Sequence, residues 1–248
     1  MNLRLTPIFA LSLLWLGGCA TPAAWERNEQ RPLSERAEDV QPLAPGQHAA
    51  PATLRTPEGE AFDLAAAYRQ RPTALVFYRG GWCPYCTTHL AALAEVEQRL
   101  TDMGYQVLAV SPDRPEKLRE SLLEHDFAYR LLSDSDMTLA RRFGVAFIVD
   151  EATRRQYEEF GIDLVEAAGE AHYMLPVPAV FLIDREGIIR FAYWDSDYRE
   201  RLDGDELLAA AERALDAAEA ARREDGVEAR IRTIDRSNRR HRLPGRHW

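Results

Sequence analysis

Two cysteines, Cys83 and Cys86, stand two residues apart in the stretch FYRGGWCPYC, which covers residues 77–86. An apolar run over 74–78 precedes them, and a helical pattern begins at the first cysteine. A thiol at a helix N-terminus lies near the positive end of the helix dipole and near unpaired backbone N–H groups, which favour the thiolate. The thiolate is the nucleophile, and a second cysteine one turn later is placed to resolve a mixed disulfide or a sulfenic acid. The spacing therefore predicts a redox-active dithiol.

Other uses of a cysteine pair fit less well. A structural zinc site needs four ligands, and His89 alone cannot complete the set; we expect His89 on the surface of the helix. Covalent haem needs histidine directly after the second cysteine, where Thr87 stands. A copper chaperone that binds its metal through a cysteine pair would have three residues between the two cysteines. We therefore expect no metal and no cofactor.

The hydrophobic pattern predicts an alternation of strands and helices around the pair. We expect strands over 74–78, 105–110, 129–132, 177–184 and 188–194, the last two forming a hairpin. We expect helices over 83–103, 115–125, around Leu139 and Phe143, over 151–160, and after Asp203. Parallel crossovers followed by an antiparallel hairpin predict an α/β sandwich with a mixed sheet.

The N-terminus is typical of an exported protein. Arg4 precedes an apolar run over 5–16 that is too short to span a bilayer comfortably. The run ends in LGGCA, which resembles a bacterial lipobox in which Cys19 becomes the lipidated first residue of the mature chain. Residues 1–18 are then a lipoprotein signal peptide, and Ala20 after Cys19 favours the periplasmic face of the outer membrane. Membrane association would occur through this lipid.

The rest of the chain divides into three parts. Residues 19–50 are rich in Pro, Ala, Glu, Arg and Gln and predict a flexible tether. Residues 51–222 are enough for one domain with a sizeable core. Residues 223–248 are basic and predict a disordered tail, with attraction to anionic lipid heads as the functional alternative. The formal net charge of the whole chain is −9, so binding to nucleic acid is not expected.

Several separated stretches resemble one family in the right order. FYRGGWCPYC, VLAVSPD, SDSDMTLARRFGV, QYEEFGIDL and LPVPAVFLIDREGIIRFAYWDSDY resemble the peroxiredoxin-like branch of the AhpC/TSA family over about residues 52–216. The resemblance implies a thioredoxin-like three-layer sandwich with a central mixed β-sheet between helices. It also implies that Pro178 is a cis-proline facing the cysteine pair.

The resemblance leaves the order of attack open. Aligned on a peroxiredoxin, Cys86 takes the peroxidatic position and Cys83 replaces a threonine. Aligned on a thioredoxin, Cys83 attacks and Cys86 resolves. Peroxiredoxins also have an arginine just before the strand that here begins near Ala179, where this chain has Pro-Val-Pro. Arg79 or Arg190 would have to replace it. The strand over 73–78 contains no acid, so no general base for Cys86 is evident.

The expected function is that of a lipid-anchored thiol oxidoreductase. As a peroxidase it would reduce hydroperoxides through a Cys83–Cys86 dithiol and disulfide cycle, with an external dithiol as reductant. The alternatives are a disulfide reductase of envelope proteins and a non-catalytic scaffold with an inert disulfide. Trp82, Tyr85 and Pro178 are the expected substrate-binding residues; for the two aromatic side chains, plain packing is an equal alternative.

Overall fold

The computed structural model describes residues 22–124 and 129–240. Its strands are β1 (Thr53–Arg55), β2 (Ala61–Asp63), β3 (Thr73–Phe77), β4 (Gln106–Ser111), β5 (Arg130–Ser133), β6 (Ala146–Ile148), β7 (Met174–Pro176), β8 (Ala179–Ile183) and β9 (Ile189–Trp194). Its α-helices are α1 (Ala24–Gln30), α2 (Leu64–Gln70), α3 (Pro84–Asp102), α4 (Pro115–Glu124), α5 (Thr138–Phe143), α6 (Glu151–Glu159), α7 (Leu164–Ala168) and α8 (Gly204–Arg240). Every strand and helix that the sequence pattern predicts lies within two or three residues of these bounds, apart from the extent of α8.

Seven strands form one mixed sheet in the order β2-β1-β5-β4-β3-β8-β9. Strands β3, β4 and β5 run parallel, while β8 and β9 form the predicted antiparallel hairpin beside β3. β3 has a strand on each side and a layer on each face, so all five of its residues are buried. This double burial explains why the run over 73–77 is almost continuously apolar.

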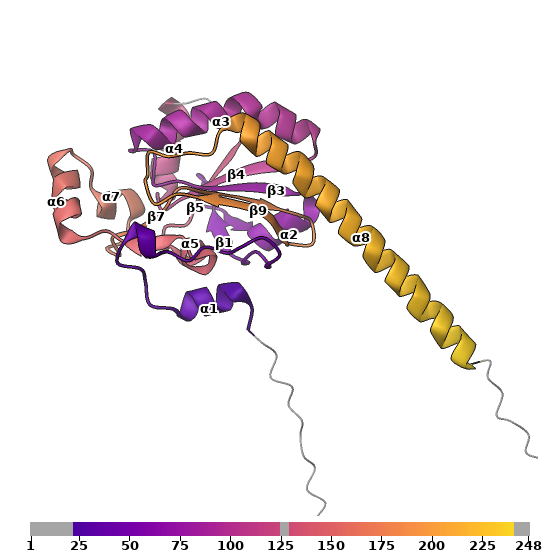
Figure 1. The fold of residues 1–248 in the computed structure, drawn as a ribbon. Helices are drawn as coiled ribbons and strands as arrows, with labels where there is room; N and C mark the ends of the chain where they lie inside the picture. Colours follow the sequence, from indigo (N-terminus) through magenta and orange to yellow (C-terminus); the bar gives the residue numbers. More distant parts are fainter. Residues whose placement is uncertain (1–21, 125–128, 241–248) are drawn as a thin grey trace, which may run out of the picture.

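Successive side chains of β3 serve two different cores, as the pleat of a strand requires. Leu75 and Phe77 lie in the core shared with α2, α5 and the N-terminal segment. Ala74 and Val76 lie in the core shared with α3 and α8. Figure 1 shows α3 and the start of α8 on one side of the sheet, with α1 and α5 on the other. The fold is the predicted thioredoxin-like three-layer sandwich.

Residues 22–50 do not form a flexible tether, so this expectation is corrected. Val40 and Leu43 are 5% and 3% exposed and belong to one of the two main cores. The Leu43 N–H donates to the Phe143 carbonyl at 2.9 Å, and α1 packs against α5. A few irregularly spaced apolar residues are enough for this docking but produce no helical or strand periodicity. The predicted signal peptide and Cys19 lie outside the described residues.

The basic tail is also not disordered over the part that the structure describes. α8 is 37 residues long and continues to Arg240; nine of the 18 residues from 223 to 240 are arginine, glutamate or alanine, which have high helix propensity. Its first turns pack on the sandwich through side chains such as Leu207 and Ala211, and its remainder extends beyond the sandwich (Figure 1). Residues 241–248 lie outside the described chain. Over the described residues, no helix has the length and apolar character needed to cross a membrane.

The segment from 145 to 175 forms a small layer of its own beside the sandwich. It contains β6 and β7, which pair as a separate two-stranded sheet, and helices α6 and α7. A small apolar cluster of Val149, Leu164 and Leu175 holds it together, and Trp82 packs against that cluster. The segment is thereby attached to the loop that carries the cysteine pair.

Candidate active site

The cysteine pair lies where β3 ends and α3 begins. Cys83 is the N-cap of α3, with Pro84 at the first helical position. The Cys83 carbonyl accepts the N–H groups of Cys86 at 2.9 Å and Thr87 at 3.1 Å, which closes the first helical turn. Both cysteines are free thiols, and they are only 2% and 0% exposed. The predicted dithiol is therefore a buried pair at a helix N-terminus.

The two thiols have opposite acidities. Hydrogen bonds from the Cys86 thiol and backbone N–H, with the nearby cations Arg79 and Arg201, outweigh burial and lower the pKa of Cys83 to about 6. The Cys86 pKa is raised well above its ordinary value, because its proton is held by Cys83 and because the group is buried. The two thiols titrate as a pair, and burial disfavours the charged form of Cys86. The geometry thus favours Cys83 as the thiolate, which is the order of attack in a thioredoxin.

Arg79 is a buried cation enclosed by aromatic rings. Its guanidinium carbon lies 5.3 Å from the Trp82 ring centre, 5.4 Å from that of Tyr157 and 4.3 Å from that of Tyr198. The same guanidinium donates a hydrogen bond to the Tyr157 hydroxyl. Such contacts compensate a buried cation for its lost water. Arg79 thereby fastens α6 to the active-site loop, and its backbone N–H acts to lower the pKa of Cys86.

Arg190 is not near the pair. It forms an ion pair of 2.6 Å with the buried Asp184, at the end of β8 that pairs with the start of β3, whereas Cys83 follows the end of β3. Arg201 is the arginine that reaches the cysteines, with Nη2 3.6 Å from the Cys86 sulfur. It comes from the loop between β9 and α8, and nothing in the local sequence pattern indicated it.

His89 is buried, at 8% exposure, so the expectation that it lies on the helix surface is wrong. The start of α8 and the loop before it cover this face of α3. Burial and the neighbouring Arg201 lower the pKa of His89 to about 4. The side chain is therefore a neutral imidazole at physiological pH, and its Nε2 has no hydrogen-bond partner among the described residues.

A buried acid lies beside the pair, although β3 contains none. Asp113 is 1% exposed and its Oδ2 accepts the Gly81 N–H at 2.8 Å, while Oδ1 has no hydrogen-bond partner in the described part of the chain. Burial raises the pKa of Asp113 to about 6. Because β3 and β4 are parallel neighbours, the residues that follow each strand meet at one edge of the sheet. The sequence Ser-Pro-Asp after β4 was the available signal for this carboxyl.

The glycines before Cys83 are needed for this close approach. Gly80 has φ +146°, and a Cβ there would lie 2.3 Å from Trp82 Nε1 and 2.8 Å from Asp113 Oδ1. A Cβ at Gly81 would lie 2.1 Å from Ser121 Oγ. The pair Gly-Gly thus lets the loop sit directly on β4 and α4.

Pro178 lies where the resemblance implies, but in another conformation. The register pairs Phe77 with Ala179, so Pro178 is buried beside the end of β3 from which the cysteine loop starts. The described residues contain no cis peptide bond, so the Val177–Pro178 bond is trans and the expected cis-proline is wrong.

The two flanking aromatic residues differ in their surroundings. Trp82 is partly buried, with its ring centre 5.8 Å from that of Tyr157, which is a packing role. Tyr85 is 48% exposed and its ring edge meets Tyr198 at 5.5 Å between centres. Tyr85 is thus the member of the predicted substrate-binding set that is open to a partner.

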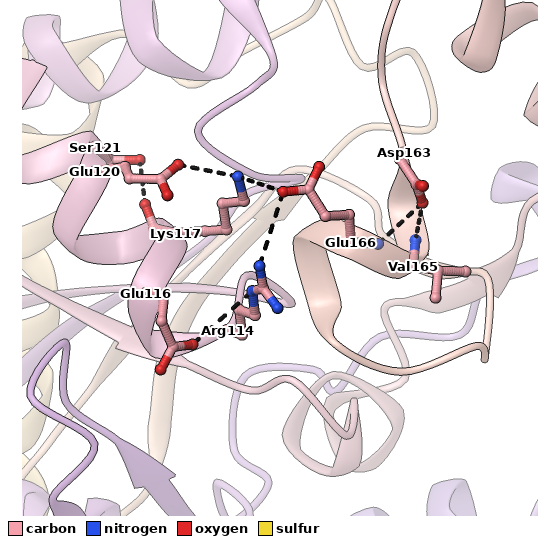
Figure 2. A network of polar contacts seen from close by, with 8 residues as sticks. All are labelled: Arg114, Glu116, Lys117, Glu120, Ser121, Asp163, Val165 and Glu166. Atoms are coloured by element: carbon pink, nitrogen blue, oxygen red, sulfur yellow. Dashed lines mark hydrogen bonds and ion pairs between the residues drawn. The ribbon is translucent and has the colours of Figure 1, made fainter.

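A polar cavity of about 220 Å³ separates the loop from α4 and α7, and Gly81, Trp82 and Asp113 line its inner end. Figure 2 shows the charged network at its rim. Lys117 on α4 contacts Glu166 on α7 at 2.8 Å. This partly exposed pair contributes little energy on its own, and both of its side chains line the cavity.

No metal site is evident in the parts of the chain that the structure describes. Carboxylates in turn-like segments accept backbone N–H groups instead. Asp134 accepts the Leu139 and Ala140 N–H groups at 2.9 and 2.8 Å. Asp195 accepts the Asp197 N–H at 2.8 Å.

Comparison with known proteins agrees with the fold. The model of the AhpC/TSA family matches residues 45–192. Peroxiredoxin Bcp of Escherichia coli strain K12 is 32% identical over 106 residues, which are 43% of this chain and 67% of that protein. In fold, the chain is similar to peroxidoxin BcpB from Mycobacterium tuberculosis, with a TM-score of 0.53 and 20% identity over 68% of this chain and 97% of that one. It is also similar to reduced Prx3 from Vibrio vulnificus, with a TM-score of 0.56 and 16% identity over 68% and 99% of the two chains.

The family match covers more than half of the chain and includes the whole dithiol loop, β4, β8 and the first part of β9. The chain therefore belongs to the AhpC/TSA family, as a peroxiredoxin-like, thiol-dependent oxidoreductase.

Proposed function

We propose that this protein is a thiol peroxidase in which Cys83 attacks a hydroperoxide and Cys86 resolves the product. The observation that carries the proposal is the acidic Cys83 thiol at the start of α3, in hydrogen-bond contact with Cys86. The Cys83 thiolate attacks one oxygen of the hydroperoxide, and the alkoxide or hydroxide that leaves takes up a proton. Cys86 then attacks the sulfenic sulfur of Cys83, and water leaves as the disulfide forms. An external dithiol reduces that disulfide.

The assignment of Cys83 differs from the peroxiredoxin alignment, in which Cys86 holds the peroxidatic position. Hydrogen peroxide mixed with the reduced full-length protein in a stopped flow, with Trp82 fluorescence as the probe, separates the two. We expect rapid second-order oxidation that Cys83→Ser abolishes, and a sulfenic acid that persists in Cys86→Ser. Oxidation that survives Cys83→Ser and is lost in Cys86→Ser would contradict the assignment. Oxidation no faster than that of an ordinary thiol would refute the peroxidase.

Disulfide reduction in envelope proteins is the second candidate. The exposed Tyr85 on Tyr198 next to the pair favours it, because an open aromatic side chain beside a thiol suits contact with a peptide. A Cys86→Ser variant would then retain protein partners as mixed disulfides with Cys83. If the variant retains none while peroxide oxidises the site quickly, this candidate is excluded.

We also propose that the protein is exported and anchored by lipid at Cys19. The support is the sequence pattern alone: a charged start, a short apolar run and a cysteine after two small residues. Metabolic labelling with a radioactive fatty acid tests this. Wild type should be labelled and found in the membrane fraction, and Cys19→Ser should lose both properties. A labelled Cys19→Ser variant would refute the anchor site.

A further inference from the structure

Arg201 contacts the sulfur of Cys86, the less acidic of the two cysteines. A role in attracting the first oxidant to Cys83 does not explain this contact. Its Nη2 is 3.6 Å from the Cys86 sulfur, and its Nη1 is fixed by the Glu200 carbonyl at 2.7 Å. Cys86 itself has no exposed surface. A half-buried cation therefore lies against a fully enclosed thiol that must lose its proton in the resolving step.

We propose that Arg201 is a catalytic residue of the second half-reaction, in which it stabilises the thiolate of Cys86 after Cys83 has been oxidised. The proposal rests on the proposed order of attack, in which Cys83 reacts first. Its new content is that this chain carries a cation in contact with the resolving thiol, on a loop outside the motif.

The other groups around Cys86 are consistent with Arg201 stabilising its thiolate. From the active-site loop, the Arg79 backbone N–H favours the thiolate of Cys86, and the Cys83 thiolate opposes its ionisation. His89 on α3 is neutral. Tyr78, at the end of β3, is a fully buried phenol, and burial raises its pKa. The buried carboxyl of Asp113 accepts the Gly81 N–H of the same loop at 2.8 Å. Arg201 is thus the cation in contact with the Cys86 sulfur.

Oxidation of Cys83 shifts the equilibrium at Cys86 from the protonated thiol toward the thiolate. In the resting pair, the thiolate of Cys83 holds the Cys86 proton by hydrogen bonding and by like-charge repulsion. Once Cys83 is a sulfenic acid or a mixed disulfide it carries no charge, so both effects disappear. The Arg79 N–H and the Arg201 guanidinium, which favour the thiolate, remain. Cys86 then ionises only when there is something for it to attack.

The resolving step can be followed without any peroxide. The aromatic disulfide dithiobis(nitrobenzoate) is added to the reduced full-length chain in a Cys19→Ser background, where Cys83 and Cys86 are the remaining thiols. The Cys83 thiolate attacks one sulfur, forming a mixed disulfide and releasing one coloured thiolate. Cys86 loses its proton to the buffer, attacks Cys83 and releases the second coloured thiolate. The Cys86→Ser variant should release only the first.

In Arg201→Gln we expect the first release to change by less than about twofold and the second to slow about ten- to a hundredfold, since a charge-assisted contact to the thiolate is lost. The pH midpoint of the second release should also rise, and Arg201→Lys should restore part of the rate. Arg199→Gln is the matched control, because Arg199 is two residues away and pairs with Asp197 at 2.8 Å. It should leave both releases unchanged.

Two results would overturn the inference: a second release as fast in Arg201→Gln as in the parent, or equal slowing of both releases with no rescue by lysine. Failure of the peroxidase proposal is separate from these results. It would appear as slow oxidation by hydrogen peroxide in a protein that still releases both thiolates normally.

Discussion

Asp113→Asn should alter how the stability of the fold depends on pH. The asparagine keeps an oxygen that can accept the Gly81 N–H, so the loop contact survives while the ionisable proton is lost. Burial raises the pKa of Asp113 from its ordinary value of 3.8 to about 6. A change of this size corresponds to ~3 kcal/mol between the protonated and charged forms.

The sign follows from proton binding. The folded protein binds the Asp113 proton more tightly than the unfolded chain does, so stability from this group is present below about pH 4 and is lost as the pH rises through about 6. Above that pH the folded wild type contains a buried carboxylate, which the variant lacks. The free energy of unfolding of the variant minus that of wild type should therefore increase by ~3 kcal/mol between about pH 4 and about pH 8.

Urea unfolding of the reduced proteins, followed by far-ultraviolet circular dichroism at several pH values, measures this difference. Cys83 titrates over the same pH range, so the comparison is repeated with Cys83→Ser in both proteins. The reasoning is refuted if the difference between variant and parent is the same at every pH.

Three further changes test separate contacts by urea unfolding. Tyr157→Phe keeps the ring against Trp82 but removes the hydroxyl that binds Arg79, and should cost about 1–3 kcal/mol; no loss would show that Arg79 does not need it. Gly81→Ala places a Cβ 2.1 Å from Ser121 Oγ and should destabilise the protein by about 1–3 kcal/mol. Adding Ser121→Gly should recover part of that loss, and no recovery would place the strain elsewhere. Leu43→Ala should cost about 2–5 kcal/mol, whereas a mobile tether would show no change.

Local sequence pattern was sufficient for most of the sandwich. The apolar run of β3 and the three- and four-residue spacing on α3 reflect burial directly, and Gly104 and Gly144 mark helix ends. The cysteine pair was recognisable because its chemistry depends on residues close together in sequence. For these features, each element carries its own signal.

What the pattern missed depends on contacts between distant segments. Asp113 meets Gly81 because two parallel strands end side by side, and Arg201 meets Cys86 across 115 positions of the chain. His89 looked like a surface residue because the loop before α8 that covers it lies far away in sequence. The docking of residues 22–50 relies on single apolar side chains such as Leu43 without any period. Such contacts depend on how distant segments are brought together by the fold, so the local sequence pattern does not indicate them.

The position of β3 in the sheet affects the order in which parts of the protein unfold. Its backbone is hydrogen-bonded to β4 on one edge and β8 on the other, and its side chains are buried on both faces. Amide hydrogens in such a strand exchange with solvent only when the whole domain opens. The loop that carries the cysteine pair begins at the end of β3 and is therefore attached to the part of the protein that unfolds last. Heating or denaturant should therefore abolish thiol reactivity together with global unfolding, while the outer strands β2 and β9 exchange their amides earlier.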